Sequence, residues 1–290
     1  MNEQKPVLTM LNGLMRRYKE RVSDVDVIIN AMIQHNLIRN ENDIVNDHIA
    51  FRTFGIEHLG IQSLEKIMLS YGYAKRDFYR FETKKLTAYW FAPPKDIPNL
   101  PRLFISQCEV SQLSKKTQEI IAHYTKHITK DPVDDLNLNN GKAVDSFLHT
   151  PLWDIPTWED YQHVLKESEY AAWVLYNRYY LNHFTITIQD LKEGYNSIEL
   201  FNNFLQSIGI KLNQAGGKIK ISKDKKLIQS STVAKTINAQ FPHKNGKFHQ
   251  HEIAGSYVEF AQRIDSRDGF EVGNADKIFE STFTSEINPH

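Results

Sequence analysis

Cysteine is nearly absent from this sequence of 290 residues, in which Cys108 is the one thiol. A disulfide within the chain is therefore excluded, and so is a zinc site built from several thiolates of one chain. Proteins without disulfides are common in reducing compartments, so we expect a cytoplasmic location. A chain of this length buries a substantial core without such crosslinks.

The sequence also lacks an excess of charge of either sign and a long apolar run. Lys and Arg together number 35, as do Asp and Glu, so the formal net charge is zero. This balance gives no reason to expect nucleic acid or an anionic membrane as a partner. No stretch approaches the roughly 20 apolar residues of a membrane span, and the first residues lack the apolar segment of a signal peptide. We expect a soluble protein that acts on a small molecule.

Helical periodicity marks the first part of the chain. Apolar side chains recur three to four residues apart over residues 7–38, and the pattern is interrupted near Ser23 and Asp24. We therefore predict two N-terminal helices that precede the first strand-like segment.

A strand followed by a helix comes next. Residues 47–55 alternate β-branched and aromatic side chains with polar ones, which predicts a strand with His48 and Arg52 on one face. The apolar period then changes to that of a helix, for which Ser63 is a candidate N-cap and Gly72 a candidate stop. Further strand-like segments follow at residues 76–92 and 102–110.

The middle of the chain differs from its surroundings. Helical periods over residues 116–128 and 158–179 flank a turn-rich stretch, which predicts a helical insert. After it, strand-like sequence at 180–188, a helix at 197–208 and strands at 217–230 and 255–264 repeat the earlier order. We expect four parts: N-terminal helices (1–40), a first module (41–114), a helical insert (115–179), and a second module with the C-terminal segment (180–290).

The two modules also agree at single residues. His48 in the first strand of one matches His183 in the first strand of the other, and the serines and glycines at the helix ends match as well. The last strand of each carries a carboxylate, Glu109 or Glu259. Two long copies in the same order indicate duplication of a βαβββ unit rather than a solenoid.

Two imidazoles and a carboxylate at matched positions predict a metal site. In a duplicated βαβββ unit, the first and last strands of each copy converge on a shared cleft, where these side chains meet. Such a set on one face of an octahedral iron leaves positions for a chelating substrate and for dioxygen. The repeat by itself leaves Glu109 and Glu259 as equal candidates for the carboxylate.

Several motifs together resemble the 2-oxoadipate dioxygenase/decarboxylase family, within the vicinal-oxygen-chelate superfamily. The resemblance covers most of the chain, from about residue 40 onward. The motifs are Asn46–Phe54 (Asn-Asp-His-Ile-Ala-Phe-Arg-Thr-Phe), residues 182–185 (Asn-His-Phe-Thr), Tyr257–Arg263 (Tyr-Val-Glu-Phe-Ala-Gln-Arg), and residues 268–271 and 273–275 (Asp-Gly-Phe-Glu and Gly-Asn-Ala).

The resemblance implies an α+β fold in which two βαβββ modules of vicinal-oxygen-chelate type form a curled mixed sheet around a metal cleft. It implies Fe(II) held by His48, His183 and Glu259, with Arg52 as the arginine that binds a substrate carboxylate. These four would be the catalytic residues. The reaction implied is that of 2-oxoadipate, a 2-oxo dicarboxylate, with dioxygen to give 2-hydroxyglutarate and carbon dioxide in lysine catabolism.

Two arginines are candidates for binding a substrate carboxylate. Arg52 lies four residues after His48, on the same face and about 13 Å away by strand rise. A guanidinium there can grip the far end of a dicarboxylate with two hydrogen bonds. Arg263 lies four residues after Glu259, and we predict for it either a second clamp on the substrate or a structural ion pair.

Other interpretations of the same pattern stay open. A vicinal-oxygen-chelate scaffold also suits a ring-cleaving dioxygenase, a glyoxalase-like isomerase, or a metal-free module that binds a small molecule. His243, His249 and His251 have a spacing that attracts metals, but we predict an exposed loop near the cleft mouth for them. Oligomeric state is left open.

Overall fold

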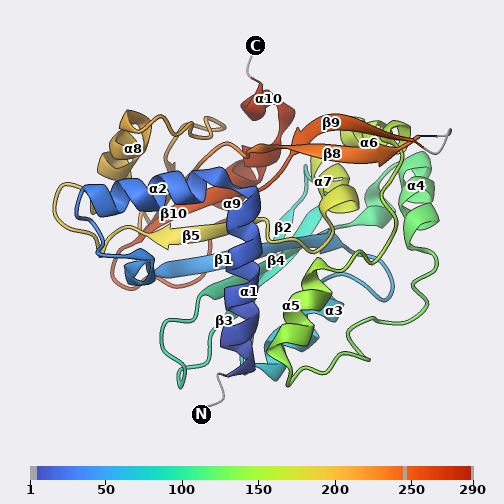
Figure 1. The fold of residues 1–290 in the computed structure, drawn as a ribbon, viewed down its shortest axis with the longest axis horizontal. Coiled ribbons are helices and arrows are strands. Elements are labelled where there is room, and N and C mark those ends of the chain that lie inside the picture. Colours follow the sequence, from blue (N-terminus) through green and yellow to red (C-terminus); the bar gives the residue numbers. More distant parts are fainter. Residues whose placement is uncertain (1–4, 244–246, 289–290) are drawn as a thin grey trace.

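The computed structural model describes residues 5–243 and 247–288 as an α+β fold (Figure 1). Its helices are α1 (Pro6–Arg21), α2 (Ser23–Gln34), α3 (Ile61–Ser70), α4 (Lys115–Thr125), α5 (Gly141–His149), α6 (Trp158–Glu167), α7 (Glu169–Asn177), α8 (Ile198–Ser207), α9 (Val272–Phe279) and α10 (Thr284–Ile287), with the 3-10 turns η1 (Glu41–Asp43), η2 (Val110–Gln112) and η3 (Glu280–Thr282). Among the described residues, no helix combines the length and apolarity that a bilayer span requires.

A mixed sheet and a separate hairpin contain the strands. The strands are β1 (Asn46–Phe54), β2 (Ala74–Phe81), β3 (Leu86–Ala92), β4 (Arg102–Cys108), β5 (His183–Thr187), β6 (Lys220–Ile221), β7 (Leu227–Ser231), β8 (Thr236–Pro242), β9 (Phe248–Ala254) and β10 (Tyr257–Arg263). The sheet order is β2-β3-β4-β1-β5-β10-β7-β6, and β8 pairs with β9 alone.

This order confirms the predicted duplication. In each module the first strand pairs in parallel with the last, β1 with β4 and β5 with β10, and the two modules join where β1 and β5 pair antiparallel. A helix, α3 or α8, follows the first strand of each. From either edge of the sheet inward, the last position before the centre is therefore the last strand of a module and the central position is its first strand, β1 or β5. In Figure 1, α1 and α2 lie across one face of these central strands.

The strand register shows which positions of the two modules correspond. His48 on β1 pairs with Arg102 on β4, and Phe104 stands two places further along β4. In the second module, Glu259 stands two places beyond the residue that pairs with His183. Phe104, an apolar residue, is therefore the counterpart of Glu259.

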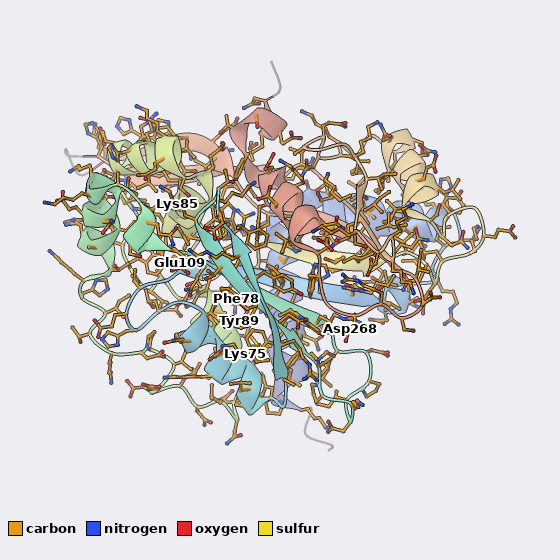
Figure 2. All side chains as sticks on the ribbon, turned by 180° about the vertical axis from the view of Figure 1, so that it is seen from behind. Lys75, Phe78, Lys85, Tyr89, Glu109 and Asp268 are labelled. Carbon is orange, nitrogen blue, oxygen red and sulfur yellow. The ribbon has the colours of Figure 1, made fainter. Side chains whose placement is uncertain are left out.

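The predicted equivalence of Glu109 and Glu259 is consequently wrong. β4 ends at Cys108, and the Glu109 carboxylate accepts hydrogen bonds from the side chains of Thr87 and Gln107. Figure 2 places Glu109 near Lys85, at the end of β4 away from Asp268. The error arose because the second module contains the β8–β9 hairpin ahead of its last strand, which shifts the spacing of the two copies.

The hairpin corrects one part of the prediction of an exposed loop: His243 and His249 are exposed as expected, but the segment forms a hairpin. His249 and His251 lie on β9, where the His251 ring stacks on Trp158 of α6 at 3.8 Å between ring centroids. The His243 ring stacks on that of His249 at 4.6 Å. Residues 244–246 between the strands lie outside the described residues. The three imidazoles thus belong to a hairpin packed beside α6 rather than to a loop.

The ends of the two module helices follow from local backbone chemistry. Gly72 stops the first helix as predicted, and its φ of +84° is one that glycine adopts without strain. Ser63 is not the N-cap, because α3 begins after Gly60 and the Ser63 hydroxyl donates from inside the helix to Asp131. Ser197 does cap α8 and accepts a hydrogen bond from a backbone N–H of its first turn.

The N-terminal helices are present as predicted, with the break at Val22. The α1 helix packs tightly on α5, since a Cβ at Gly13 would lie 2.2 Å from the Asp145 side chain. Residues 115–177 contain α4, α5, α6 and α7. From α7, the buried Tyr170 and Trp173 reach the face of the sheet that carries Arg52.

Candidate metal centre

Three adjacent strands bring the predicted ligands together. His48 from β1, His183 from β5 and Glu259 from β10 point from the same face of the sheet, and each can offer an atom within 4.8 Å of the other two. The Nε2 atom of His48 lies 3.5 Å from one carboxylate oxygen of Glu259, and Nε2 of His183 lies 3.2 Å from the other. All three side chains are buried. Alternation along each strand and pairing between strands produce this convergence.

Each imidazole is oriented by the residue just before it. Nδ1 of His48 donates to the Asp47 carboxylate at 2.8 Å, and Nδ1 of His183 donates to the Asn182 amide oxygen at 3.0 Å. A proton fixed on Nδ1 leaves Nε2 as the lone pair that faces Glu259, and at His48 this atom also accepts a hydrogen bond from Thr185 Oγ1 at 3.0 Å. The duplication therefore extends to the groups behind the ligands, one anionic and one neutral.

Arg263 secures the carboxylate behind His48. Its Nε and one terminal nitrogen donate to the two oxygens of Asp47 at 2.7 and 2.9 Å, and its other terminal nitrogen donates to the carbonyls of Arg267 and Gly269. Burial by itself would raise the pKa of Asp47, but Arg263 and His48 hold this pKa well below its usual range. Of the two roles predicted for Arg263, the structure shows the ion pair, because most of its donors are engaged behind His48.

Two consecutive side-chain hydrogen bonds support Glu259. The Gln229 amide on β7 donates to a Glu259 oxygen at 2.5 Å, and the Asn274 amide on α9 donates to the Gln229 oxygen at 2.9 Å. Sequence reasoning assigned no role to either residue. The signal was slight: Asn274 lay in a quoted motif, and Gln229 is a polar residue in a buried strand.

The two imidazoles differ in their tendency to hold a proton. Burial would lower the pKa of His48, but the carboxylates of Glu259 and Asp47 outweigh it and raise this pKa. Burial lowers the pKa of His183 well below its usual value, and the positive charges of His48 and Arg52 add to the effect. A cation bound between the rings takes the place of the proton that the carboxylates favour.

The donor set suits a transition metal of intermediate hardness. Two neutral imidazole nitrogens and one carboxylate oxygen make up the two-histidine, one-carboxylate arrangement of non-haem iron sites with open positions. At the place equivalent to Glu259, Phe104 supplies no donor. We therefore predict that a substrate would approach a bound metal from the side of Phe104.

Arg52 is buried on the same face as His48 without a carboxylate partner. Its terminal nitrogens donate to Thr282 Oγ1 at 2.8 Å and to the Phe279 carbonyl at 3.1 Å, while its Nε has no partner. Burial lowers its pKa. Among the described residues no acidic group forms an ion pair with it, and an unpaired buried charge is costly. This arrangement favours an anionic ligand.

Tyr257 stands beside this guanidinium. It pairs with His183 across β10 and β5, and its ring lies 4.8 Å from the His183 ring. Its hydroxyl is buried and has no hydrogen-bond partner. Burial raises the pKa of the phenol, and among charged groups the opposing effect of Arg52 is the largest.

Comparison with known proteins shows the family to which the chain belongs. The family model described as 2-oxoadipate dioxygenase/decarboxylase matches residues 10–266. The chain belongs to this family. A relative from Arabidopsis thaliana named 2-oxoadipate dioxygenase/decarboxylase, chloroplastic, is 43% identical over 282 residues, which cover 87% of this chain and 72% of the relative.

Solved structures agree with this family assignment. The hydroxyglutarate synthase from Oryza sativa, solved in complex with 2-oxoadipate, matches with a TM-score of 0.83 and 37% identity over 96% of this chain and 92% of that one. A protein from Ralstonia eutropha described as a member of the glyoxalase superfamily matches with a TM-score of 0.73 over 90% of this chain and 84% of that one. At 20% identity, the latter shows the fold alone. The predicted family and fold are confirmed.

In this member of the 2-oxoadipate dioxygenase/decarboxylase family, a C-terminal segment beyond the matched residues covers the metal centre. We call α9 and η3, residues 272–282, the covering segment. Its Ala275, Ile278 and Phe279 line a chamber of 20 Å³ together with the metal-centre side chains, Phe104, Gln229 and Phe270. A chamber of this size holds about one water molecule.

Contacts on several sides hold the covering segment in place. Lys84, in the turn between β2 and β3, forms ion pairs with Asp276 at 2.8 Å and Glu280 at 2.9 Å. The Asn213 side chain donates to Ser281 Oγ at 2.8 Å. The hydrogen bonds from Arg52 complete the attachment, so the group that favours an anion also holds the cover.

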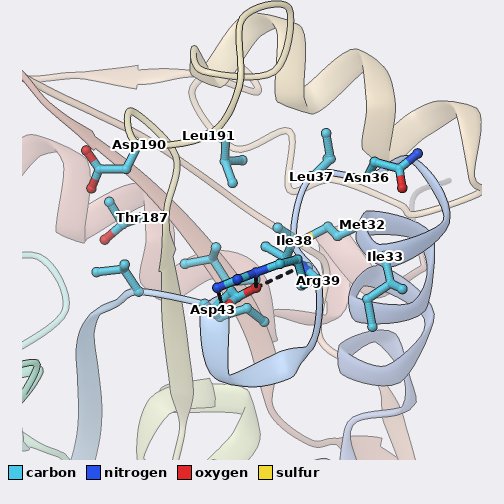
Figure 3. Close-up of a pocket in the computed structure, with 13 residues that line it drawn as sticks. Met32, Ile33, Asn36, Leu37, Ile38, Arg39, Asp43, Thr187, Asp190 and Leu191 are labelled. Atoms are coloured by element: carbon cyan, nitrogen blue, oxygen red, sulfur yellow. Dashed lines mark hydrogen bonds and ion pairs between the residues drawn. The ribbon is translucent and has the colours of Figure 1, made fainter.

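Larger hollows than this chamber lie elsewhere in the part of the chain that the structure describes. A hollow of 520 Å³ lies where α2 and the following loop meet the end of β5 (Figure 3). The Arg39–Asp43 ion pair, seen in Figure 3 as dashed lines, forms part of its lining, and Met32 and Leu191 form another part. No residue of the triad lines it, so volume is a poor guide to the site in this fold.

Proposed function

We propose that this protein is an iron(II)-dependent dioxygenase that converts 2-oxoadipate and dioxygen to 2-hydroxyglutarate and carbon dioxide, as a step of lysine catabolism. Membership of the 2-oxoadipate dioxygenase/decarboxylase family supports the reaction, and the structural relative bound to 2-oxoadipate supports the substrate. The observation that carries the proposal is the buried triad of His48, His183 and Glu259 with an uncompensated arginine on the same face. A cytoplasmic location stays a prediction.

Iron(II) at the triad would supply chelation of a 2-oxo carboxylate and activation of dioxygen. The protein's own part is to hold and orient. His48 and His183 present Nε2 because Asp47 and Asn182 bind their Nδ1 protons. Aromatic side chains around the chamber, such as Phe104, keep water away from the reacting atoms.

Arg52 would bind the carboxylate at the far end of the substrate. Along β1 it stands about 13 Å from His48 measured between backbone positions, and both residues lie on the same face of the sheet. A dicarboxylate chelated at one end can extend its other carboxylate to the guanidinium. The reaction needs no further co-substrate, because one 2-oxoadipate and one dioxygen contain all the atoms of one 2-hydroxyglutarate and one carbon dioxide.

Reconstitution without oxygen tests the proposal. The purified protein is loaded with Fe(II) under nitrogen, 2-oxoadipate is added, air is admitted, and oxygen uptake is followed with the mass of the product. We expect equimolar consumption of oxygen and formation of 2-hydroxyglutarate. The variant His48→Ala should lose activity by about a hundredfold or more, since removal even of groups behind a metal ligand costs 10–100-fold.

An exposed histidine provides the matched control. His123 lies on α4 and is exposed, so His123→Ala should retain wild-type turnover. Turnover of 2-oxoadipate that is unchanged in His48→Ala would falsify the role of the triad. Conversion of a substrate without oxygen uptake would instead favour a glyoxalase-like isomerase.

A further inference from the structure

Tyr257 is a second unpaired donor next to Arg52. The phenol is completely buried, yet neither its hydroxyl nor Arg52 Nε makes a hydrogen bond of good geometry, although the two groups lie close enough to interact with each other. A buried hydroxyl without a hydrogen bond costs free energy, so a folded protein retains one only where something compensates. Two such donors side by side therefore indicate an acceptor that binds between them.

The strand register places Tyr257 level with His183 and one row of residues nearer to Arg52 than Glu259 is. Tyr257 precedes Glu259 by two residues on β10, which puts both on the face of the sheet that carries the triad. Its ring leans on that of His183 at an interplanar angle of 30°. Arg52 lies on the same face two residues beyond Ala50, the partner of His183 on β1.

We propose that the Tyr257 hydroxyl and Arg52 Nε together donate to the distal carboxylate of the substrate. This inference rests on the proposed function and adds a residue that selects the substrate class. A carboxylate oxygen accepts two hydrogen bonds at once, and a phenol is a neutral donor at physiological pH. The terminal nitrogens of Arg52 are already engaged by the covering segment, which leaves the Nε edge for the ligand.

Selection against other 2-oxo acids follows from the same pair. A 2-oxo monocarboxylate would fill the apolar part of the site and leave both donors buried and unpaired. Sites built to hydrogen-bond a substrate group reject analogues that lack it much more strongly than apolar pockets reject a missing methylene. Tyr257 would thus favour dicarboxylates over monocarboxylates of equal chain length.

The test compares Tyr257→Phe with wild type on two substrates of equal carbon number. With 2-oxoadipate, we expect Tyr257→Phe to raise KM and the Kd measured by anaerobic calorimetry by about tenfold or more, with kcat within about twofold, because a hydrogen bond to a charged group is lost. With 2-oxohexanoate, which has no distal carboxylate, the two proteins should behave alike. The melting temperature of Tyr257→Phe without substrate should equal or exceed that of wild type.

Tyr179 offers a matched control. Its hydroxyl is also buried without a partner, so Tyr179→Phe makes the same chemical change elsewhere and should leave KM unaltered. A KM for 2-oxoadipate that is equal in Tyr257→Phe and wild type, or one that rises equally for both substrates, would overturn the inference alone. Failure of the wild type to bind and oxidise 2-oxoadipate would overturn the proposed function, and this inference with it.

Discussion

At the scale of single residues, what stands behind each histidine sets how firmly it can hold a metal. His48 has an anionic carboxylate behind it, itself fixed by a buried arginine, whereas His183 has only the amide of Asn182. An anionic partner raises the basicity of the imidazole and fixes its orientation. His48 should therefore be the stronger of the two nitrogen donors.

Replacing Asp47 tests this difference. Asp47→Asn removes the anion behind His48 and leaves the Arg263 charge buried without its partner, so we expect metal affinity to fall about 10–100-fold and the protein to lose stability. Metal titration followed by calorimetry measures the first effect, and thermal unfolding measures the second. Asp43→Asn, which breaks an exposed ion pair with Arg39, should change neither. Equal metal affinity in Asp47→Asn and wild type would contradict the assignment.

At the scale of elements, local pattern predicted most strands and helices but not all of their ends. The spacing of apolar residues predicts β1, α1, α2 and α8, because in each of them apolar residues recur at the interval of a strand or of a helix. The prediction of Ser63 as the N-cap was wrong because α3 begins directly after Gly60. A serine near the start of a helix is only a weak indication of where the helix begins. The β8–β9 hairpin was missed although residues 236–241 of β8 alternate polar and apolar side chains, because β9 carries a run of polar residues without such alternation.

We predict that the covering segment controls access to the candidate metal centre. The chamber beneath it is far smaller than a six-carbon dicarboxylate, so the segment has to move for a substrate to enter. Its attachment to the first module depends on Lys84, whose side chain is only 13% exposed between two carboxylates. A tether of this kind couples the C-terminal segment to the β2–β3 turn.

Removing the tether should loosen the segment. We expect Lys84→Met to speed amide hydrogen exchange of residues 272–282 by roughly fivefold, the factor that about 1 kcal/mol represents. Exchange in β8 and β9 should stay as it is. Lys277 pairs with the same two carboxylates from within α9, and its ammonium forms no ion pair with another part of the described chain, so Lys277→Met is the control. Unaltered exchange in Lys84→Met would show that other contacts hold the cover.

At the scale of the whole molecule, a nearly symmetric sheet has an asymmetric site. The two modules supply one histidine each, but Glu259 has Phe104 as its counterpart. The absence of a fourth protein donor would leave positions on a bound metal for substrate and dioxygen. The asymmetry, more than the symmetry, suits the site to oxygenation.

Restoring the symmetry should inhibit the enzyme. We expect Phe104→Glu to bind Fe(II) or Mn(II) more tightly than wild type by about tenfold and to lose most turnover of 2-oxoadipate, because a fourth ligand occupies a position that the substrate requires. Phe104→Leu keeps the apolar character and should retain turnover within about tenfold. Metal titration and oxygen uptake on the three proteins decide the matter. Full activity in Phe104→Glu would mean that the substrate approaches from another side.

The sequence by itself determined the duplicated modules, the two histidines and the face that Arg52 shares with His48. These depend on alternation along a strand and on order along the chain, which are local properties. Only the tertiary structure decided that Phe104 rather than Glu109 stands opposite Glu259, that Arg263 serves Asp47, and that the covering segment closes over the site. Register between strands and packing of distant segments depend on contacts far apart in sequence, and no local pattern carries that information.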